Sequence, residues 1–278
     1  MSVGHSGRTP AKHDLMRSIV GREVGVAGTM PAVTRLVWFD LTAGDGIPVY
    51  GADWTRNCSP GILASHAKAS VKPVDIRMYE IKPRTYDRLL VSLGEQLPAL
   101  GYRQLENEVW AYGDVVVLYA HNASGSEAPV DGIARTDAVL AVNDPNAITD
   151  WAIRPTFAEE LRSRTPWSRS LSTMGCNPAG LKRLPQEERL VWFELIAQQE
   201  AALPDHRDLL LAAIEGDDSQ WAYLLCDPVK WRTTQEKVAR SAFAKYGYAL
   251  EMAWHRTHGA QFEALKQRLF LTRKERAA

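Results

Sequence analysis

An apolar segment that ends in an acidic residue and opens into a glycine-rich turn constrains the fold of this chain most strongly. Residues 36–41 have the pattern of a short buried strand with Asp40 near its end, and two glycines follow shortly after. A second predicted strand, residues 75–81, carries Glu80 near its end. In an open α/β sheet, ligands bind at the carboxyl ends of the strands, where a glycine turn and an acidic residue on the next strand form the site. These two segments therefore predict such a sheet and such a site.

The rest of the chain alternates between strand and helix patterns. Further strands are predicted at 115–119, 138–142 and 168–174, and helices at 11–20, 59–70, 84–100, 185–202, 230–246 and 261–271. Two apolar runs, 208–214 and 221–225, are joined by a polar turn and indicate an antiparallel hairpin. This order predicts an α/β, Rossmann-like fold, in which a mostly parallel twisted sheet has helices on both faces and an antiparallel hairpin at its edge.

No linker divides the chain into separate parts. Residues 1–10 are small and polar, which predicts a flexible lead. Residues 11–278 are predicted to form one domain with a helical extension from about residue 229.

Composition limits the classes of partner and compartment. The chain has 33 Lys and Arg against 33 Asp and Glu, so any contact with nucleic acid must come from a local patch. Its three cysteines lie far apart and lack the spacing of a zinc ribbon or a disulfide framework, and we predict no metal site. No signal peptide is evident, and no apolar run approaches the roughly 20 residues of a membrane helix. We expect a soluble, cytoplasmic protein without a membrane partner.

The glycine turn excludes two common nucleotide motifs. The dinucleotide fingerprint needs a third glycine where this chain has Val49, and no Gly-Lys-Ser/Thr follows a glycine loop, which excludes a P-loop. The remaining pattern, Asp-x-x-Ala-Gly-x-Gly with an acid at the next strand end, favours S-adenosyl-L-methionine as the cofactor. The predicted cofactor contacts are Asp40, Thr42, Ala43, Gly44, Asp45, Gly46, Glu80, Ile81, Gly113 and Asp114.

The acidic residues of this set have separate predicted roles. Glu80 would accept both ribose hydroxyls in a bidentate, charge-assisted contact. Asp40 or Asp45 would contact the amino group of the methionine part. Gly113 and Asp114 are interpreted as a third strand end, where an acid receives the adenine amine. Each of these carboxylates alone also fits a solvated loop residue, so the prediction depends on the whole set.

A candidate reaction loop follows the strand predicted at 138–142. There Asp144 and the carbonyl of Pro145, with Asn146 next to them, would accept hydrogen bonds from an amine and orient its lone pair toward a methyl donor. Trp151 is the nearest aromatic residue that would stack on a base. An ordinary Asp-Pro turn that closes a strand is the alternative.

In their order along the chain, these motifs resemble two related families. One comprises the adenine-N6 methyltransferases of large-subunit ribosomal RNA, and the other is the three-Cys-motif partner family found beside phage and mobile-element genes. The matching segments are Asp40–Gly46, Ser59–Ile62, Tyr79–Pro83, Gly113–Asp114 and Asp144–Pro145, with Lys12–His13 near the start. The resemblance spans roughly residues 11–226. It implies a class I methyltransferase fold, S-adenosyl-L-methionine as methyl donor, an amine acceptor, and contact of His13 with cofactor or substrate.

The residues after Pro145 depart from the family pattern. Such enzymes have Asp-Pro-Pro-Tyr or a near relative, whose aromatic ring stacks on the flipped base, whereas this chain has Asn146 and Ala147. Base stacking is worth about 1–3 kcal/mol, so Trp151 would have to supply the ring. We predict a methyltransferase for a nucleic-acid base amine, with adenine N6 as the favoured acceptor. Two alternatives stay open: a non-catalytic module of this fold that binds a protein or nucleic acid, and a methyltransferase for small molecules or proteins.

A run of basic residues without an intervening acid follows the reaction loop. It comprises Arg162, Arg164, Arg169, Lys182 and Arg183. The run predicts a phosphate track for RNA or DNA beside the site, and a solvated basic loop is the alternative. The predicted substrate contacts are His13, Trp151, Arg162, Arg164 and Arg169.

Overall fold

The computed structural model describes residues 9–48, 53–144, 155–175, 209–216, 221–226 and 235–271. Its helices are α1 (Thr9–Val26), α2 (Trp54–Asn57), α3 (Ser59–Ala67), α4 (Pro83–Gln96), α5 (Pro155–Arg164), α8 (Gln235–Ala244) and α9 (Gly259–Phe270). Its strands are β1 (Arg35–Asp40), β2 (Val74–Tyr79), β3 (Arg103–Glu106), β4 (Val109–Tyr112), β5 (Val116–His121), β6 (Asp137–Asn143), β7 (Ser168–Gly175), β8 (Leu210–Ile214), β9 (Trp221–Cys226) and β10 (Leu250–Trp254).

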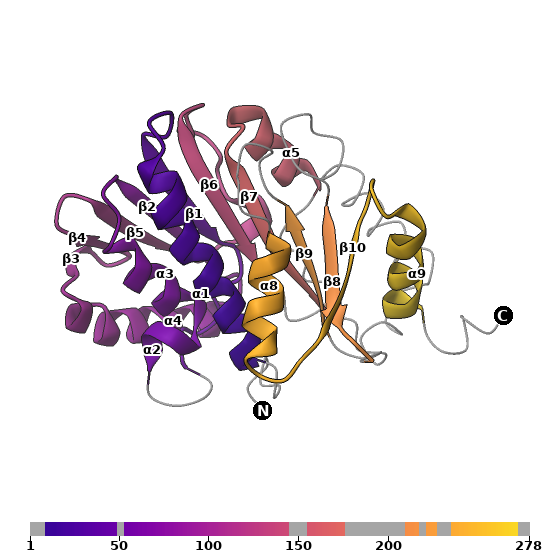
Figure 1. Ribbon diagram of the computed structural model, residues 1–278. Coiled ribbons are helices and arrows are strands. Elements are labelled where there is room, and N and C mark those ends of the chain that lie inside the picture. Colours follow the sequence, from indigo (N-terminus) through magenta and orange to yellow (C-terminus); the bar gives the residue numbers. More distant parts are fainter. Residues whose placement is uncertain are drawn as a thin grey trace.

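The strands form one sheet in the order β10-β8-β9-β7-β6-β1-β2-β5-β4-β3 (Figure 1). The central strands β5, β2, β1, β6 and β7 run parallel. Antiparallel strands flank them on both sides, with β4 and β3 next to β5 and with β9, β8 and β10 beyond β7. In the middle of the sheet, Trp38 pairs with Ile76 of β2 and with Leu140 of β6, and all three side chains are fully buried.

Helices cover both faces of this sheet. Alternate residues of the central strands, such as Leu36 and Trp38, pack in one core with α1, α3, α4 and α8, and α1 and α8 lie in front of the sheet in Figure 1. Val37 and Phe39 point to the other face, where they pack with Val130 and with Leu161 of α5. On that same face α9 covers β8, β9 and β10. Because β1 and β6 are buried on both faces, their sequences are continuous apolar runs without a polar alternation.

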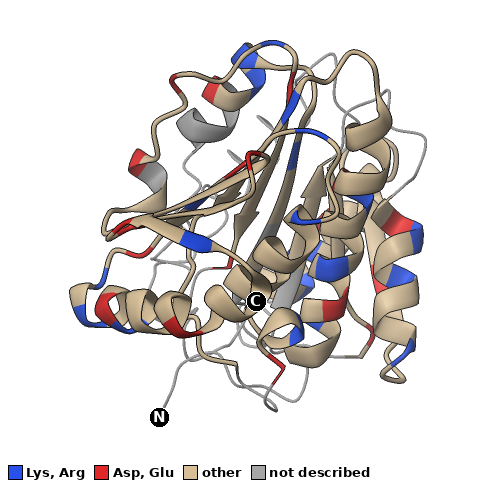
Figure 2. Cartoon of the chain, turned by 90° about the vertical axis from the view of Figure 1, so that its left-hand side faces the viewer, with Lys and Arg blue, Asp and Glu red and all other residues tan. Residues whose placement is uncertain are grey.

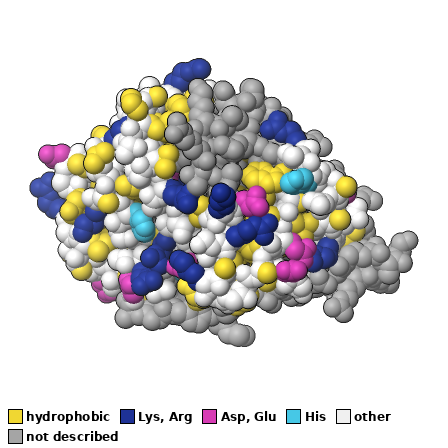
Figure 3. Space-filling model, viewed as in Figure 1, with side chains coloured by type: hydrophobic (Ala, Val, Ile, Leu, Met, Phe, Trp, Pro, Cys, Tyr) yellow, Lys and Arg dark blue, Asp and Glu magenta, His cyan; other side chains and the backbone are white. Residues whose placement is uncertain are grey.

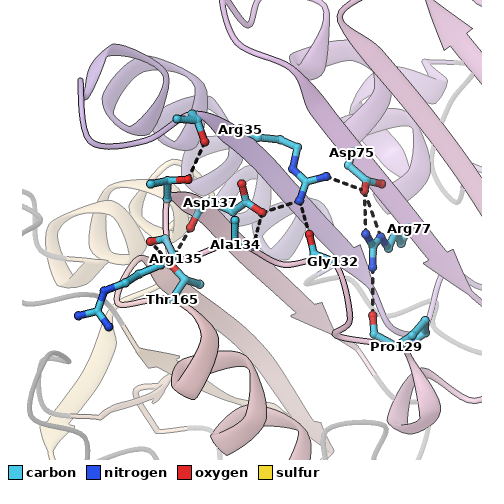
Figure 4. A network of polar contacts seen from close by, with 11 residues as sticks. Arg35, Asp75, Arg77, Pro129, Gly132, Ala134, Arg135, Asp137 and Thr165 are labelled. Atoms are coloured by element: carbon cyan, nitrogen blue, oxygen red, sulfur yellow. Dashed lines mark hydrogen bonds and ion pairs between the residues drawn. The ribbon is translucent and has the colours of Figure 1, made fainter.

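A polar network fixes the end of the sheet where β1, β2 and β6 begin (Figure 4). Arg35 donates to the Asp137 carboxylate at 2.5 Å and to the Gly132 carbonyl at 2.6 Å. Arg77 contacts Asp75 at 2.9 Å and the Pro129 carbonyl at 3.0 Å. Charge-assisted hydrogen bonds are stronger than neutral ones, so this network holds the segment before β6 against three strands. It lies at the amino ends of these strands and therefore belongs to the scaffold, at the opposite end from the predicted site.

The structure confirms the predicted α/β fold, with parallel strands, helices on both faces and the hairpin of β8 and β9. Five helices and strands of the described residues were not predicted, namely α2, α5, β3, β4 and β10. Strand β3 pairs with β4 in a second hairpin, β10 adds an edge strand within the region expected to be a helical extension, and helix α5 precedes β7. Thr9 and Pro10, assigned to the lead, begin α1. The helix predicted at 185–202 lies outside the described residues.

Charged residues of both signs are distributed over the surface. Seen from the side of the β3 edge, basic and acidic residues are interspersed (Figure 2), as expected for a chain with equal numbers of both. Within the described ranges, no helix has the length and apolar character that a membrane span requires.

Candidate functional site

The chain reverses its direction of winding at β1. From β1 it passes to β2 on one side and returns through β6 on the other side, so β1 lies between both. In open α/β sheets such a topological switch point is where ligands bind, outside the carboxyl ends of the strands. At this point the sequence places Asp40 at the end of β1, Glu80 after β2 and Asp144 after β6.

The glycine turn after β1 is hydrogen-bonded to α2 and α4 at one of its two glycines. Gly44 and Gly46 both have φ of +65°, a conformation that side-chain-bearing residues rarely adopt. The Gly46 carbonyl accepts hydrogen bonds from the Trp54 indole at 2.8 Å and from the Ser92 hydroxyl at 2.7 Å. At Gly44, by contrast, no atom of the described residues beyond its chain neighbours lies within 4 Å of the position that a Cβ would occupy. The turn is therefore anchored on one side and open at Gly44.

The end of β2 lies directly beside this turn. The amide of Ala43 donates to the carbonyl of Tyr79 at 2.9 Å, which brings the glycine turn next to Glu80, as predicted. The Glu80 carboxylate accepts a hydrogen bond from the Lys82 amide at 2.8 Å, and the Glu80 carbonyl accepts one from the Asn122 side chain at 2.8 Å. Glu80 is 8% exposed, so its carboxylate is oriented by the backbone before any ligand binds.

Asp40 is a buried carboxylate with an unsatisfied oxygen. The residue is 1% exposed, and its Oδ2 atom has no hydrogen-bond partner among the described residues. The pKa of Asp40 is raised to about 7, because burial, together with the charges of Asp144 and Glu80, outweighs the hydrogen bonds from Ser59 and Thr42. An unpaired buried carboxylate oxygen is costly, so a cationic or hydrogen-bond-donating ligand at this place would remove the cost.

Asp144 is held from three separate parts of the chain. Its amide donates to the Thr42 hydroxyl at 2.7 Å, and its carboxylate accepts hydrogen bonds from the Thr173 hydroxyl and the Lys12 ammonium. Burial works to raise the pKa of the Asp144 carboxyl, but the charge and hydrogen bond of Lys12 and the Thr173 hydroxyl hold it below its ordinary value. Asp144 is therefore ionised at neutral pH, in a fixed orientation, and its side chain stays 30% exposed.

The first turn of α1 brings His13 to the same end of the sheet. Burial, with the charge of Lys12, lowers the pKa of His13 to about 4, against the opposing charges of Asp144 and Asp14. His13 is 8% exposed and is therefore a neutral imidazole at neutral pH. The Lys12–His13 element, noted from the family resemblance, lies beside Asp144 in the structure, because Lys12 forms an ion pair with Asp144. The predicted contact of His13 with cofactor or substrate stays a prediction.

Two other predicted cofactor residues take different positions. Asp45 is paired with Arg88 of α4 at 2.9 Å, so its charge is directed to the protein. Ile81 is 61% exposed immediately after Glu80. Three further predicted residues, Pro145, Asn146 and Trp151, lie outside the part of the chain that the structure describes.

The predicted position of Gly113 and Asp114 is wrong. They form the turn between β4 and β5, with φ of +55° at Gly113, and so precede β5. Since β5 is parallel to β2, this turn lies at the amino end of the sheet, away from Glu80. The carboxyl end of β5 carries His121 and Asn122 instead, and sequence reasoning missed both because no motif marks them.

The predicted phosphate track is also wrong in its position. Arg169 lies within β7, where it is 4% exposed and forms an ion pair with Glu23 of α1 at 3.3 Å. Arg162 is 9% exposed in α5, and Arg164 pairs with Asp131 at 3.3 Å. All three precede or begin β7 and so lie toward its amino end. Lys182 and Arg183 lie outside the described residues.

Neutralising Asp40 is expected to change how stability depends on pH. Because burial raises the pKa of Asp40 from 3.8 to about 7, the folded protein holds a proton there that the unfolded chain releases. Stability therefore falls as pH rises from about 4 to about 7, by at most roughly 4 kcal/mol. Asp40→Asn should remove this loss, so urea titrations should show the variant gaining relative to the wild type between pH 5 and pH 8. A difference that stays constant with pH would contradict the buried titration.

Comparisons with known proteins support the fold. No family model and no curated protein matches the sequence. Among solved structures, protein LPL1258 of Legionella pneumophila str. Philadelphia 1, described as a DUF519 member, aligns over 90% of this chain and 98% of its own, with a TM-score of 0.52 and 9% identity. The α/β fold is shared. At this identity the likeness extends to the fold alone.

Weaker likenesses include an rRNA methylase and Trm1. An rRNA methylase from Streptococcus thermophilus aligns over 77% of this chain and 96% of its own, with a TM-score of 0.42 and 11% identity. Trm1 from Pyrococcus horikoshii, in a complex with S-adenosyl-L-methionine, aligns over 91% of this chain and 64% of its own, with a TM-score of 0.42 and 13% identity.

Proposed function

We propose that this protein is an S-adenosyl-L-methionine-dependent methyltransferase that acts on an exocyclic amine of a nucleic-acid base, with adenine N6 as the first candidate. One observation carries the proposal. The open glycine turn after β1 is hydrogen-bonded to the end of β2 beside Glu80, and an ionised, oriented Asp144 lies across the switch point at the end of β6.

The residues at the switch point fit the cofactor. Gly44 leaves room for a ligand to lie against the backbone, and Glu80 is oriented to accept ribose hydroxyls. The unsatisfied Oδ2 of Asp40 suits a cationic group, because an opposite charge stabilises a buried carboxylate. When bound, S-adenosyl-L-methionine supplies a methyl group that is already activated on a sulfonium.

The chain's own contribution to the reaction is then orientation and charge stabilisation, and the methylated amine would release its surplus proton to solvent. Asp144 would accept a hydrogen bond from the acceptor amine and direct its lone pair, which lowers the barrier mainly through alignment. The same carboxylate, with its pKa held low by Lys12, favours the partial positive charge that grows on the amine as it is methylated. The resemblance of the motifs to adenine-N6 methyltransferases supports this choice of acceptor.

Labelling tests the proposal directly. The protein is incubated with tritiated S-adenosyl-L-methionine in the presence of RNA, DNA and a protein extract, and the three pools are separated and counted. Label in RNA or DNA, located on a base amine after digestion, supports the proposed acceptor. Label only in protein or in small molecules would leave a methyltransferase but overturn its substrate. No transfer, together with intact binding of S-adenosylhomocysteine, would favour the non-catalytic module, which the replacement of the family's aromatic residue suggests.

A further inference from the structure

The predicted phosphate track does not lie beside the site, so nucleic acid would need another surface near the switch point. A group of basic and aromatic side chains occurs where α1 begins and α8 ends. We call this group the basic rim and define it as Asp14, Arg17, Arg56, Lys245 and Tyr246. The inference rests on the proposed function, because it names the partner of that same site.

Asp14 holds the basic rim together. Its carboxylate lies 2.7 Å from the Arg17 guanidinium and 3.3 Å from the Lys245 ammonium, which come from different parts of the chain. Burial and a hydrogen bond to Asp14 raise the pKa of Tyr246, while the charges of Arg17 and Arg56 act on the same phenol in the opposite direction. Helix α1 packs against both α2, which carries Arg56, and α8, which Lys245 and Tyr246 follow. The five side chains therefore lie within one small area.

The rim carries an excess of positive charge, and its charged side chains differ in exposure, with Arg17 30% exposed and Asp14 10% exposed. The side chains of Arg56 and Lys245 are each 58% exposed, and Tyr246 is 42% exposed. Arg56 pairs with Asp53 at 3.9 Å, and Arg17 and Lys245 share Asp14. Three positive side chains therefore have two carboxylates as partners. Basic side chains gather on the face of the molecule that carries α1 and α8 (Figure 3).

The basic rim adjoins the candidate site. Asp14 follows His13 on the first turns of α1, and Lys12 on the same turn is paired with Asp144. The charge of Asp14 acts on His13. A strand whose acceptor base lies at Asp144 would therefore have its neighbouring phosphates near the beginning of α1.

We propose that the basic rim binds the backbone and one base of a single-stranded nucleic acid next to the acceptor nucleotide. Arg56, Arg17 and Lys245 supply donors for phosphate oxygens, which Arg and Lys bind by charge-assisted hydrogen bonds. The exposed ring of Tyr246 supplies a surface on which a base stacks. A basic groove with an aromatic ring is the usual arrangement for single strands. Because the whole chain has no net charge, a local excess of this kind is required for such binding.

Salt-dependent binding of RNA tests the rim. The probe is a fluorescein-labelled single-stranded RNA containing adenines, and anisotropy is measured at several salt concentrations. The double variant Arg56→Glu/Lys245→Glu should bind several-fold more weakly and should lower the slope of log K against log salt by about 0.7 for each phosphate that the variant no longer neutralises. Tyr246→Ala should weaken binding roughly 5- to 100-fold with little change in slope, as expected when a base has no ring on which to stack.

The controls separate the rim from the fold and from the proposed reaction. Arg103→Glu changes an exposed arginine on the edge strand β3 and should bind as the wild type does. Melting temperature and calorimetric binding of S-adenosylhomocysteine should be unchanged in every variant. If RNA is methylated but the rim variants bind it with wild-type affinity and slope, the rim is wrong and the proposed function stands.

Two other outcomes overturn the proposal in different ways. If the wild type neither binds nor methylates RNA or DNA, the proposed acceptor fails together with the rim. If polyglutamate competes with RNA for the wild type at equal charge concentration, and the rim variants lose polyglutamate and RNA binding equally, the surface belongs to an acidic protein partner.

Discussion

Replacing Asp144 with alanine should lower the rate of methyl transfer by about 10²- to 10³-fold, the range seen when one oriented polar group is removed from an active site. The reason is that Asp144 has both the charge and the fixed direction that an amine needs, through its contacts with Thr42, Thr173 and Lys12. The loss should appear in kcat with tritiated S-adenosyl-L-methionine, while the Kd of the cofactor should change by less than about threefold.

Control variants show whether this loss reports on chemistry. Asp131→Ala removes a carboxylate that is 88% exposed and lies toward the amino ends of the strands, and its activity should equal that of the wild type. Lys12 loses its ion pair in Asp144→Ala, so the variant's unfolding curve must be measured alongside. An Asp144→Ala enzyme that is folded and as active as the wild type would rule out the role of Asp144 in the reaction.

Replacing Glu80 with alanine should weaken binding of S-adenosylhomocysteine roughly 10- to 100-fold. A carboxylate that accepts hydrogen bonds contributes about 1.5–3 kcal/mol for each charge-assisted contact, and tenfold in affinity corresponds to about 1.4 kcal/mol. Glu80 is oriented for this by the Lys82 amide. Isothermal titration calorimetry measures the effect directly and needs no acceptor, so it tests the cofactor site separately from the reaction.

Asp114 provides the matched control for Glu80. It is also an acidic residue of the predicted cofactor set, but it lies exposed in the turn before β5, at the other end of the sheet. Asp114→Ala should therefore bind S-adenosylhomocysteine like the wild type. Equal losses in both variants would mean that the effect comes from general destabilisation, and no loss in Glu80→Ala would place the ribose elsewhere.

The parts of the site that lie on buried strands were predictable from sequence. Strands β1 and β6 are buried on both faces, so their apolar runs identified them, and the polar residue that ends each run marked its carboxyl end. The glycine turn was predictable for a similar reason, because positive φ at Gly44 and Gly46 favours glycine. Asp40, Glu80 and Asp144 follow from these two patterns.

Other residues depended on contacts that no local pattern carries. The turn at Gly113 was recognised, but whether a turn ends one strand or begins the next depends on how the chain pairs, and here it joins β4 to β5 as a hairpin. Arg169 belongs to a run of basic residues that predicts exposure to solvent. Its burial depends on an ion pair with Glu23 of α1, which is far away in sequence. Thr173 had no sequence signal, whereas Lys12 had only the family resemblance.

The three groups that hold Asp144 come from the first helix, from the turn after the first strand and from the seventh strand, at positions 12, 42 and 173. A fragment of this chain that lacks residue 12 or residue 173 therefore lacks one of the three groups that hold Asp144. During folding, the carboxylate acquires its counter-ion only after the first helix has docked on strands made much later in synthesis. A nascent chain is therefore unable to hold Asp144 by all three groups until well over half of its length has left the ribosome.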